Sequence, residues 1–154
     1  MKQRSEKNGS KNDNWETPEY IYIPLNEEFK FDFDPCPLNH DLNLWDGLEI
    51  DWKESNFVNP PYSYPLKDLF IKKAYEEWKK GKTCVLLIPT ATDTKSFHKY
   101  IYPYFKSGEI EIRFPEKRVR FKGFNSTGIY VTNKTGQSGS MIVIMKAQND
   151  ILPN

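Results

Sequence analysis

The chain has 154 residues, of which 38% are hydrophobic and 28% are charged, and its formal net charge is +1 at pH 7. These values fit a single globular domain with a core of its own. No apolar run reaches the ~20 residues of a membrane-spanning helix, and no signal-peptide pattern opens the chain. Cys36 and Cys84 lie far apart and His40 and His98 are isolated, so we expect a cytoplasmic protein with two reduced thiols and no metal site.

The near-zero net charge conceals one acidic and one basic region. Residues 26–54 carry nine acidic side chains against Lys30 and Lys53. Residues 113–122 carry five basic side chains against Glu116 alone. A chain with this asymmetry can attract a polyanion to one part of its surface while it stays near neutral overall.

The first predicted elements follow a polar N-terminus. Residues 1–13 have several basic side chains and no apolar period, and we expect a disordered basic tail there, followed by a domain over residues 14–147. Thr17 is a plausible N-cap, with Pro18 at the first position of a short helix. The alternation of apolar and polar residues over 29–33 predicts a strand that ends at Asp34-Pro35.

The middle of the chain carries the strongest strand and helix patterns. Residues 36–54 have no clear period and are expected to form an acidic loop anchored by Leu44, Trp45 and Leu48. A short strand is predicted at 56–58 and a helix at 67–80, with Gly81 as its C-terminal stop. The continuous apolar run at 84–88 is typical of a buried parallel strand.

The remaining elements complete an α/β pattern. We expect a short helix at 94–100, strands at 110–114, 119–121 and 141–145, and a mobile loop over residues 122–140. In α/β sheets, ligands bind beyond the carboxyl ends of the strands. Asp34 and Asn59 both fall at such ends, so they should be neighbours.

The tetrapeptide Asn59-Pro60-Pro61-Tyr62 follows the short strand and suits the chemistry of an amine substrate. An amine conjugated to an aromatic ring is a poor nucleophile, and accepting hydrogen bonds from both of its protons moves the nitrogen toward tetrahedral geometry. The Asn59 side-chain oxygen and the Pro60 carbonyl can be these acceptors. Tyr62 can stack on a flat base. The alternative is a proline-stiffened turn after a strand.

This tetrapeptide resembles the catalytic motif of S-adenosylmethionine-dependent methyltransferases that act on exocyclic or amide nitrogens. Further motifs stand in order along the chain, at residues 15–18, 31–36, 57–63, 86–94 and 118–121. With them, the chain resembles the phage-type DNA N-6-adenine methyltransferase (Dam) family over about residues 14–146. The resemblance implies a class I methyltransferase with a reduced Rossmann-like α/β fold, acting on double-stranded DNA in a bacterial host cell and encoded by a phage or prophage.

The resemblance also implies residues that bind the cofactor S-adenosylmethionine. Asp34, Pro35 and Cys36 match the cofactor-binding corner, although the glycine pair of wider methyltransferase families is missing. Trp15, Thr17 and Pro18 match the N-terminal element that covers the cofactor. Asp46 can hold the ribose hydroxyls, as an acid does in nucleotide-binding folds. The alternatives are an Asp-Pro turn, an ordinary helix start and a solvated loop acid.

The basic region predicts a contact with nucleic acid. Arg118, Arg120 and Lys122 alternate with Val119 and Phe121, so the charges are expected on one face of a strand, where they suit phosphate contacts. The alternative is an edge strand that its charges protect from aggregation. A target base must leave the duplex to reach the site.

Two other functions compete with DNA methylation. A glutamine-directed protein N-methyltransferase shares the Asn-Pro-Pro-Tyr motif, and the basic strand argues against it. A nucleic-acid binding module that keeps the fold without turnover is the other, and the missing glycine pair favours it. Binding of the cofactor separates a binding module from an enzyme.

Overall fold

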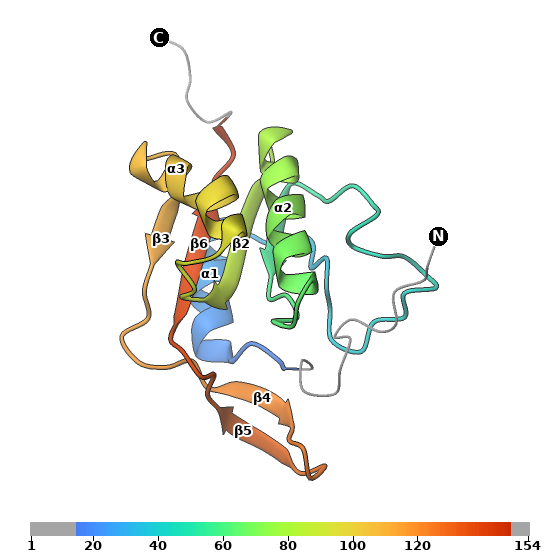
Figure 1. The fold of residues 1–154 in the computed structure, drawn as a ribbon. Helices are drawn as coiled ribbons and strands as arrows, with labels where there is room; N and C mark the ends of the chain where they lie inside the picture. Colours follow the sequence, from blue (N-terminus) through green and yellow to red (C-terminus); the bar gives the residue numbers. More distant parts are fainter. Residues whose placement is uncertain (1–14, 149–154) are drawn as a thin grey trace.

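A computed structural model describes residues 15–148, so the predicted basic tail at 1–13 lies outside the described residues. The elements run in the order α1 (Glu19–Phe29), β1 (Ser55–Val58), α2 (Leu66–Lys79), β2 (Thr83–Pro89), η2 (Phe97–Ile101), α3 (Tyr102–Lys106), β3 (Glu111–Arg113), β4 (Phe121–Phe124), β5 (Tyr130–Lys134) and β6 (Ser140–Met145). A central sheet lies between α2 and α3 on one face and α1 on the other, and the β4–β5 hairpin extends below it (Figure 1).

The central sheet has four strands in the order β1-β2-β6-β3 and is mixed. β1 runs parallel to β2, whereas β6 is antiparallel to both β2 and β3. The parallel pair is connected through α2, as expected for a crossover between parallel strands. The predicted α/β class is confirmed, as are the predicted strands at 56–58, 84–88, 110–114 and 141–145, within one residue at most ends.

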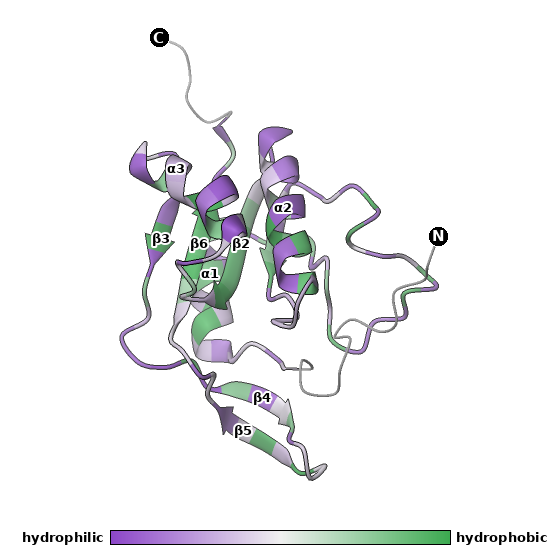
Figure 2. Ribbon diagram, viewed as in Figure 1, coloured by the Kyte–Doolittle hydropathy of each residue, from purple (hydrophilic) through white to green (hydrophobic). Residues whose placement is uncertain are grey.

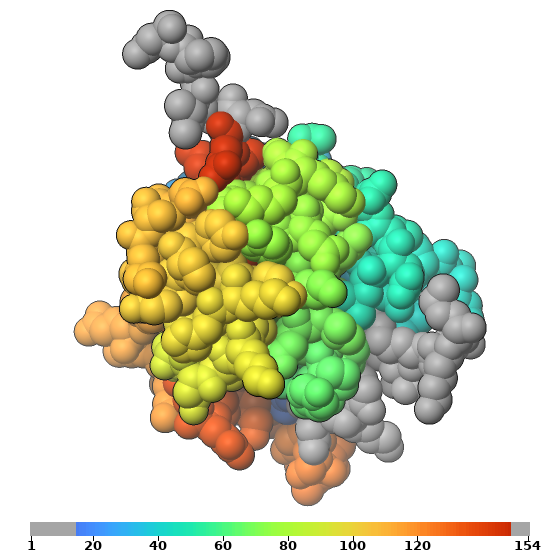
Figure 3. Space-filling model, turned by 45° about the horizontal axis from the view of Figure 1, so that its top comes forward, coloured from blue at the N-terminus to red at the C-terminus, as the bar shows by residue number. Residues whose placement is uncertain are grey.

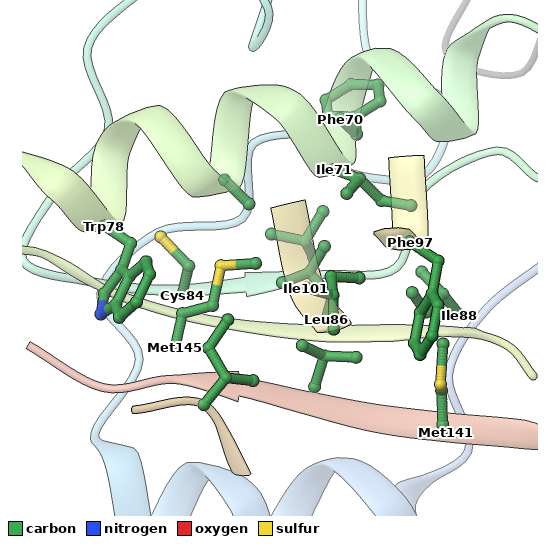
Figure 4. Packing of buried hydrophobic residues seen from close by; sticks show 14 of the residues in the cluster. Phe70, Ile71, Trp78, Cys84, Leu86, Ile88, Phe97, Ile101, Met141 and Met145 are labelled. Atoms are coloured by element: carbon green, nitrogen blue, oxygen red, sulfur yellow. The ribbon is translucent and has the colours of Figure 1, made fainter. Parts of the chain in front are cut away.

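The strand side chains alternate between two buried layers. Cys84, Leu86 and Ile88 of β2 face α2, whereas Val85 and Leu87 face the layer beneath α1. This alternation follows from the pleat of a strand that is covered on both faces. Figure 4 shows the α2 layer, in which Trp78 and Ile71 point from α2 toward β2 and β6, and Figure 2 shows the apolar strands at the centre.

The predicted strand over residues 29–33 is wrong. The helix α1 continues to Phe29 and ends at Lys30, which has the left-handed φ of 51°. The chain is extended only afterward, and Phe33 alone makes a parallel bridge to Asn56 of β1. Phe29, the last residue of α1, and Phe31 both pack against the apolar cluster on this face of the sheet. The position of Phe29 therefore follows the helical period of α1 and not the period of a strand.

The helix α2 spans Leu66–Lys79, so each of its ends lies one residue before the predicted bounds of 67 and 80. Gly81 follows the helix with a φ of 100°, as expected for its C-terminal stop. Its inner face carries a buried carboxylate. Glu77 is 0% exposed and makes ion pairs with Lys73 at 3.0 Å, Lys80 at 3.2 Å and Lys82 at 2.7 Å. These three cations satisfy a charge that burial would otherwise make very costly.

The helix predicted at 94–100 is longer than expected. A π-helical turn, η2, continues directly into α3, so helical structure extends to Lys106. The Thr94 hydroxyl accepts a hydrogen bond from the Phe97 backbone amide at 3.3 Å, near the start of this helical segment. In Figure 3 this segment and α2 lie side by side over one face of the molecule.

The prediction of a strand at 119–121 and a mobile loop over 122–140 is wrong in detail. β4 begins only at Phe121, and it pairs with β5 in a hairpin. Asn125 makes the turn compact, because its Oδ1 accepts hydrogen bonds from the backbone amides of Thr127 and Ile129 at 3.0 and 2.9 Å. Gly128 takes a φ of 80°, which suits glycine in such a turn.

The acidic segment between α1 and β1 forms a loop as predicted, and two of its three predicted anchors pack on the protein. The prediction of Leu44 as an anchor is wrong, because its side chain is 76% exposed, whereas Trp52 is buried in the core. Trp45 packs on Phe33, and Leu48 contacts the α2 layer. Among residues 15–148, no helix is long and apolar enough to cross a membrane.

Candidate active site

Asn59 directly follows β1, where the strand delivers it to the carboxyl edge of the sheet. Its side-chain amide nitrogen donates two hydrogen bonds, to the Trp15 carbonyl at 3.1 Å and to the Thr17 hydroxyl at 3.0 Å. Both Nδ2 hydrogens are therefore used within the protein. The remaining polar atom of the side chain is Oδ1, an acceptor.

The N-terminal segment 15–17 connects Asn59 to the hairpin. Glu16 and Lys122 of β4 exchange two backbone hydrogen bonds, at 2.7 and 3.1 Å. The residues on either side of Glu16 are the two that hold Asn59. Thr17 is not the predicted N-cap, because Pro18 occupies that position and the Thr17 hydroxyl accepts from Asn59.

The predicted cofactor corner lies beside Asn59. The Cys36 thiol donates to the Asn59 backbone carbonyl at 3.3 Å, and Asp34 Oδ1 accepts from the Cys36 amide at 3.0 Å. Asp34 and Asn59 are therefore neighbours, as predicted from their places at the ends of two parallel segments. Cys36 and Cys84 are both buried and form no disulfide, which confirms the prediction of two reduced thiols.

Asp46 belongs to a loop that packs tightly on this corner. A Cβ atom on the adjacent Gly47 would lie 1.8 Å from the Pro35 carbonyl oxygen, so only glycine allows this approach. Asp46 Oδ1 accepts from the Leu48 amide at 2.9 Å, and Trp52 donates to the Gly47 carbonyl at 2.7 Å. The loop is thus held from both sides, which places two acidic residues, Asp34 and Asp46, in adjoining turns.

Tyr62 closes the other side of Asn59. Its hydroxyl donates to the Leu87 carbonyl of β2 at 3.2 Å, and its ring meets Phe121 edge to face at 6.0 Å. Burial, with a smaller contribution from Cys36, raises the pKa of the Tyr62 hydroxyl, so the group stays protonated as a donor. The hydroxyl therefore points into the protein, and one part of the ring borders a pocket.

This pocket has a volume of about 450 Å³ and lies between the Asn59 loop and the hairpin. Its lining residues come from three parts of the chain and are Trp15, Asn59, Pro60, Tyr62, Phe121, Asn125, Ser126, Lys134, Thr135, Gly136 and Gln137. The volume is within the range of small-molecule sites, and a flat heterocycle fits it. The lining combines aromatic faces with amide and hydroxyl groups.

The three basic residues proposed for nucleic acid do not share a strand. Arg118 and Arg120 precede β4, and only Lys122 belongs to it. The predicted alternation in burial is nevertheless present, because Val119 and Phe121 are buried and Arg118 and Arg120 are exposed. Arg118 donates to the Gly136 carbonyl at 2.6 Å, which ties it to the pocket rim.

The hairpin contributes pocket residues that the sequence reasoning missed. The sequence pattern predicts a mobile loop at Asn125, Ser126 and residues 134–137, whereas these residues line one side of the pocket. The signal was present in the turn residues Asn125 and Gly128, flanked by aromatic and β-branched residues. Within the described part of the chain, no group of three His, Cys, Asp or Glu residues can hold a metal ion.

A family model described as DNA N-6-adenine-methyltransferase (Dam) matches residues 4–152. The match covers nearly all of the chain, and the chain belongs to this family. The resemblance based on the ordered motifs is thereby confirmed.

A curated relative is the DNA N-6-adenine-methyltransferase of Haemophilus phage HP1 (strain HP1c1). It is 31% identical over 108 residues, which are 63% of this chain and 61% of the relative. The similarity thus spans less than two thirds of the relative. No solved structure matches the chain.

Proposed function

We propose that this protein transfers a methyl group from S-adenosylmethionine to the 6-amino group of adenine in double-stranded DNA. The observation that carries the proposal is the orientation of Asn59, whose amide nitrogen is bound inside the protein and whose Oδ1 is left to accept from a substrate. The domain over residues 14–147 is proposed to be a reduced Rossmann-like class I methyltransferase. Its parallel β1–β2 pair and the site at the carboxyl edge support this class.

The proposed chemistry needs two acceptors for one amine. Asn59 Oδ1 and the Pro60 carbonyl accept the two protons of the adenine amine, which concentrates its lone pair on nitrogen. The Tyr62 ring holds the flat base in place, and Pro61 keeps the loop rigid. S-adenosylmethionine supplies an electrophilic methyl group on a sulfonium. The amine proton leaves to water, because an amide such as Asn59 is not a strong base.

The donor set beside Asn59 fits the proposed cofactor. Asp34 can accept from an amino group and Asp46 from ribose hydroxyls, since each carboxylate has more than one acceptor site. The close packing of Gly47 on Pro35 brings the two acidic turns together without side-chain bulk. The cofactor would also be bordered by the backbone of the corner at Pro35 and Cys36 and by the rings of Trp15 and Pro18.

Replacing Asp34 with alanine should weaken the binding of S-adenosylmethionine about tenfold or more, because a charge-assisted hydrogen bond is lost. Calorimetric titration of the cofactor measures this effect. Glu54→Ala is a matched control, since Glu54 is an exposed acid of the same region. If the affinity of the Asp34 variant equals that of the wild type, the cofactor is bound elsewhere.

The proposed DNA face includes the hairpin and the residues before it. Arg118, Arg120 and Lys122 offer charge to phosphates, with Lys134 at the pocket itself. At the tip of the hairpin, Phe124 is 61% exposed and Tyr130 is 51% exposed, and their rings meet at 5.4 Å. Such aromatic groups next to the pocket suit contact with bases or sugars near the target adenine.

Two variants separate charge from stacking in DNA binding. Arg120→Ala should lower affinity for unrelated duplexes alike and reduce the slope of log affinity against log salt by about 1. Tyr130→Ser should lower affinity without a change in this slope, because no charge is removed. Fluorescence anisotropy at several salt concentrations measures both. An unchanged slope for Arg120→Ala would make its side chain a solvated charge without a phosphate contact.

Sequencing of modified bases in DNA from cells that express the protein tests the proposed reaction. We expect N6-methyladenine at one short sequence, and none when Asn59 is replaced by alanine. We further propose that the protein acts in the cytoplasm of a bacterial host and is encoded by a phage or prophage. Methylation of protein glutamine without modified DNA would contradict the proposal.

A further inference from the structure

We infer that Thr17 is a positioning residue, which fixes the side-chain amide of Asn59 in the orientation that methyl transfer requires. The inference rests on the proposed function of Asn59 as an acceptor. It assigns to the Thr17 hydroxyl a role in the reaction rate, in place of the cofactor contact that the family resemblance implies.

The orientation of the Asn59 amide has one determinant that cannot be reversed. The Trp15 carbonyl is an acceptor only, so it requires the amide nitrogen on its side at 3.1 Å. If the amide were turned over, Oδ1 would face this carbonyl and the NH₂ group would face the substrate. Two donors, the amide and the amine, would then oppose each other, and the amine would lose an acceptor.

The Thr17 hydroxyl supplies the second contact, at 3.0 Å from Nδ2. A single hydrogen bond to Trp15 leaves the amide free to rotate about its side-chain torsion, whereas two acceptors fix its plane. Asn59 is only half-buried, so packing alone does not fix it. Removal of the hydroxyl should increase the population of unproductive orientations.

The backbone around Thr17 is itself held in place. Glu16 pairs through its amide and carbonyl with Lys122 of β4, and Pro18 is buried at the start of α1. Thr17 therefore stands between two fixed points, and its hydroxyl has little freedom to leave Asn59. This arrangement ties the orientation of Asn59 to the hairpin that forms the opposite wall of the pocket.

The test compares Thr17→Val, which removes the hydroxyl at nearly constant volume, with Thr17→Ser, which keeps it. Transfer of a labelled methyl group to DNA gives kcat, and calorimetry gives the affinity for S-adenosylmethionine. We expect Thr17→Val to lower kcat about tenfold with cofactor affinity within about twofold, and Thr17→Ser to restore most of the lost rate.

Three results would overturn the inference. A wild-type kcat for Thr17→Val would show that the hydroxyl does not matter, and equal losses for valine and serine would indicate a packing role. Weaker cofactor binding with an unchanged kcat would return Thr17 to the cofactor site. Each result requires a wild-type protein that methylates DNA, so a failure of the proposed function itself would appear earlier, as no transfer by the wild type.

Discussion

Replacement of Asn59 by alanine is expected to lower the rate of methyl transfer by about 10²–10³-fold, because the reacting amine loses a fixed acceptor. The affinity for S-adenosylmethionine should stay within about a few-fold of the wild-type value. The Asn59 backbone carbonyl, which accepts the hydrogen bond from the Cys36 thiol, is still present in this variant. Single-turnover transfer of tritium from labelled cofactor to DNA measures the rate. It isolates the methyl-transfer step from product release.

The control for Asn59→Ala is a measurement of its binding to cofactor and to DNA. Calorimetry with the cofactor and anisotropy with DNA show whether Asn59→Ala still forms both complexes. If both complexes form and the transfer rate is near that of the wild type, the Asn59 side chain has no role in the reaction. A variant that fails to bind the cofactor would instead show that the Asn59 side chain supports the cofactor corner.

Replacement of Glu77 by glutamine is expected to lower the free energy of unfolding by about 3 kcal/mol, because it leaves cations without their buried partner. Lys73 and Lys82 are only 14% and 16% exposed in their side chains, so water replaces the carboxylate poorly. Glu76→Gln on the same helix is the matched control. Its carboxylate is 48% exposed and lies 3.9 Å from Lys72, so its loss should cost less than about 1 kcal/mol.

Denaturant titration of the two variants gives the difference directly. Equal effects would mean that the cluster around Glu77 adds no more stability than an exposed ion pair.

The ion pairs of Glu77 also make the stability of the protein depend on pH. Burial by itself would raise the pKa of this carboxyl, but hydrogen bonds from Lys82, Lys73 and Lys80 outweigh burial and lower the pKa to about 2.

The direction of this pH effect follows from the lowered pKa. The unfolded chain binds a proton at Glu77 near the ordinary value of 4.5, before the folded protein does. The stabilisation is therefore complete above pH 4.5 and is lost as the pH falls toward 2. Glu77→Gln should lose this component of acid sensitivity, which acid titrations of the two proteins can compare.

The elements with strong apolar patterns were predictable from the sequence. β2 has a continuous apolar run because both of its faces are covered, and α2 shows a helical period with a glycine stop. The segment 29–33 was not predictable in the same way. Alternating aromatic residues there satisfy a strand pattern, although Phe29 closes a helix and Phe33 makes only a single bridge.

The sequence indicates which residues gather at the candidate site, but it does not predict the hydrogen bonds between them. The sequence pattern predicts that Asp34 and Asn59 are neighbours, and they are, although Asp34 follows a single bridge at Phe33 and not a strand. It contains no signal that the Thr17 hydroxyl accepts from Asn59, because that contact joins segments 42 residues apart. The pocket residues at 134–137 are not predictable either, since a segment rich in Gly and Ser equally suits a mobile loop.

Nucleoside analysis of methylated DNA is the most direct test of the proposed function. The purified protein is incubated with duplex DNA and S-adenosylmethionine that carries an isotopic label in its methyl group, and the DNA is digested to nucleosides for mass spectrometry. The predicted result is label in N6-methyladenine, absent from a parallel reaction with Asn59→Ala. Label in methylcytosine, or label in protein with none in DNA, would contradict the assignment of adenine as the substrate.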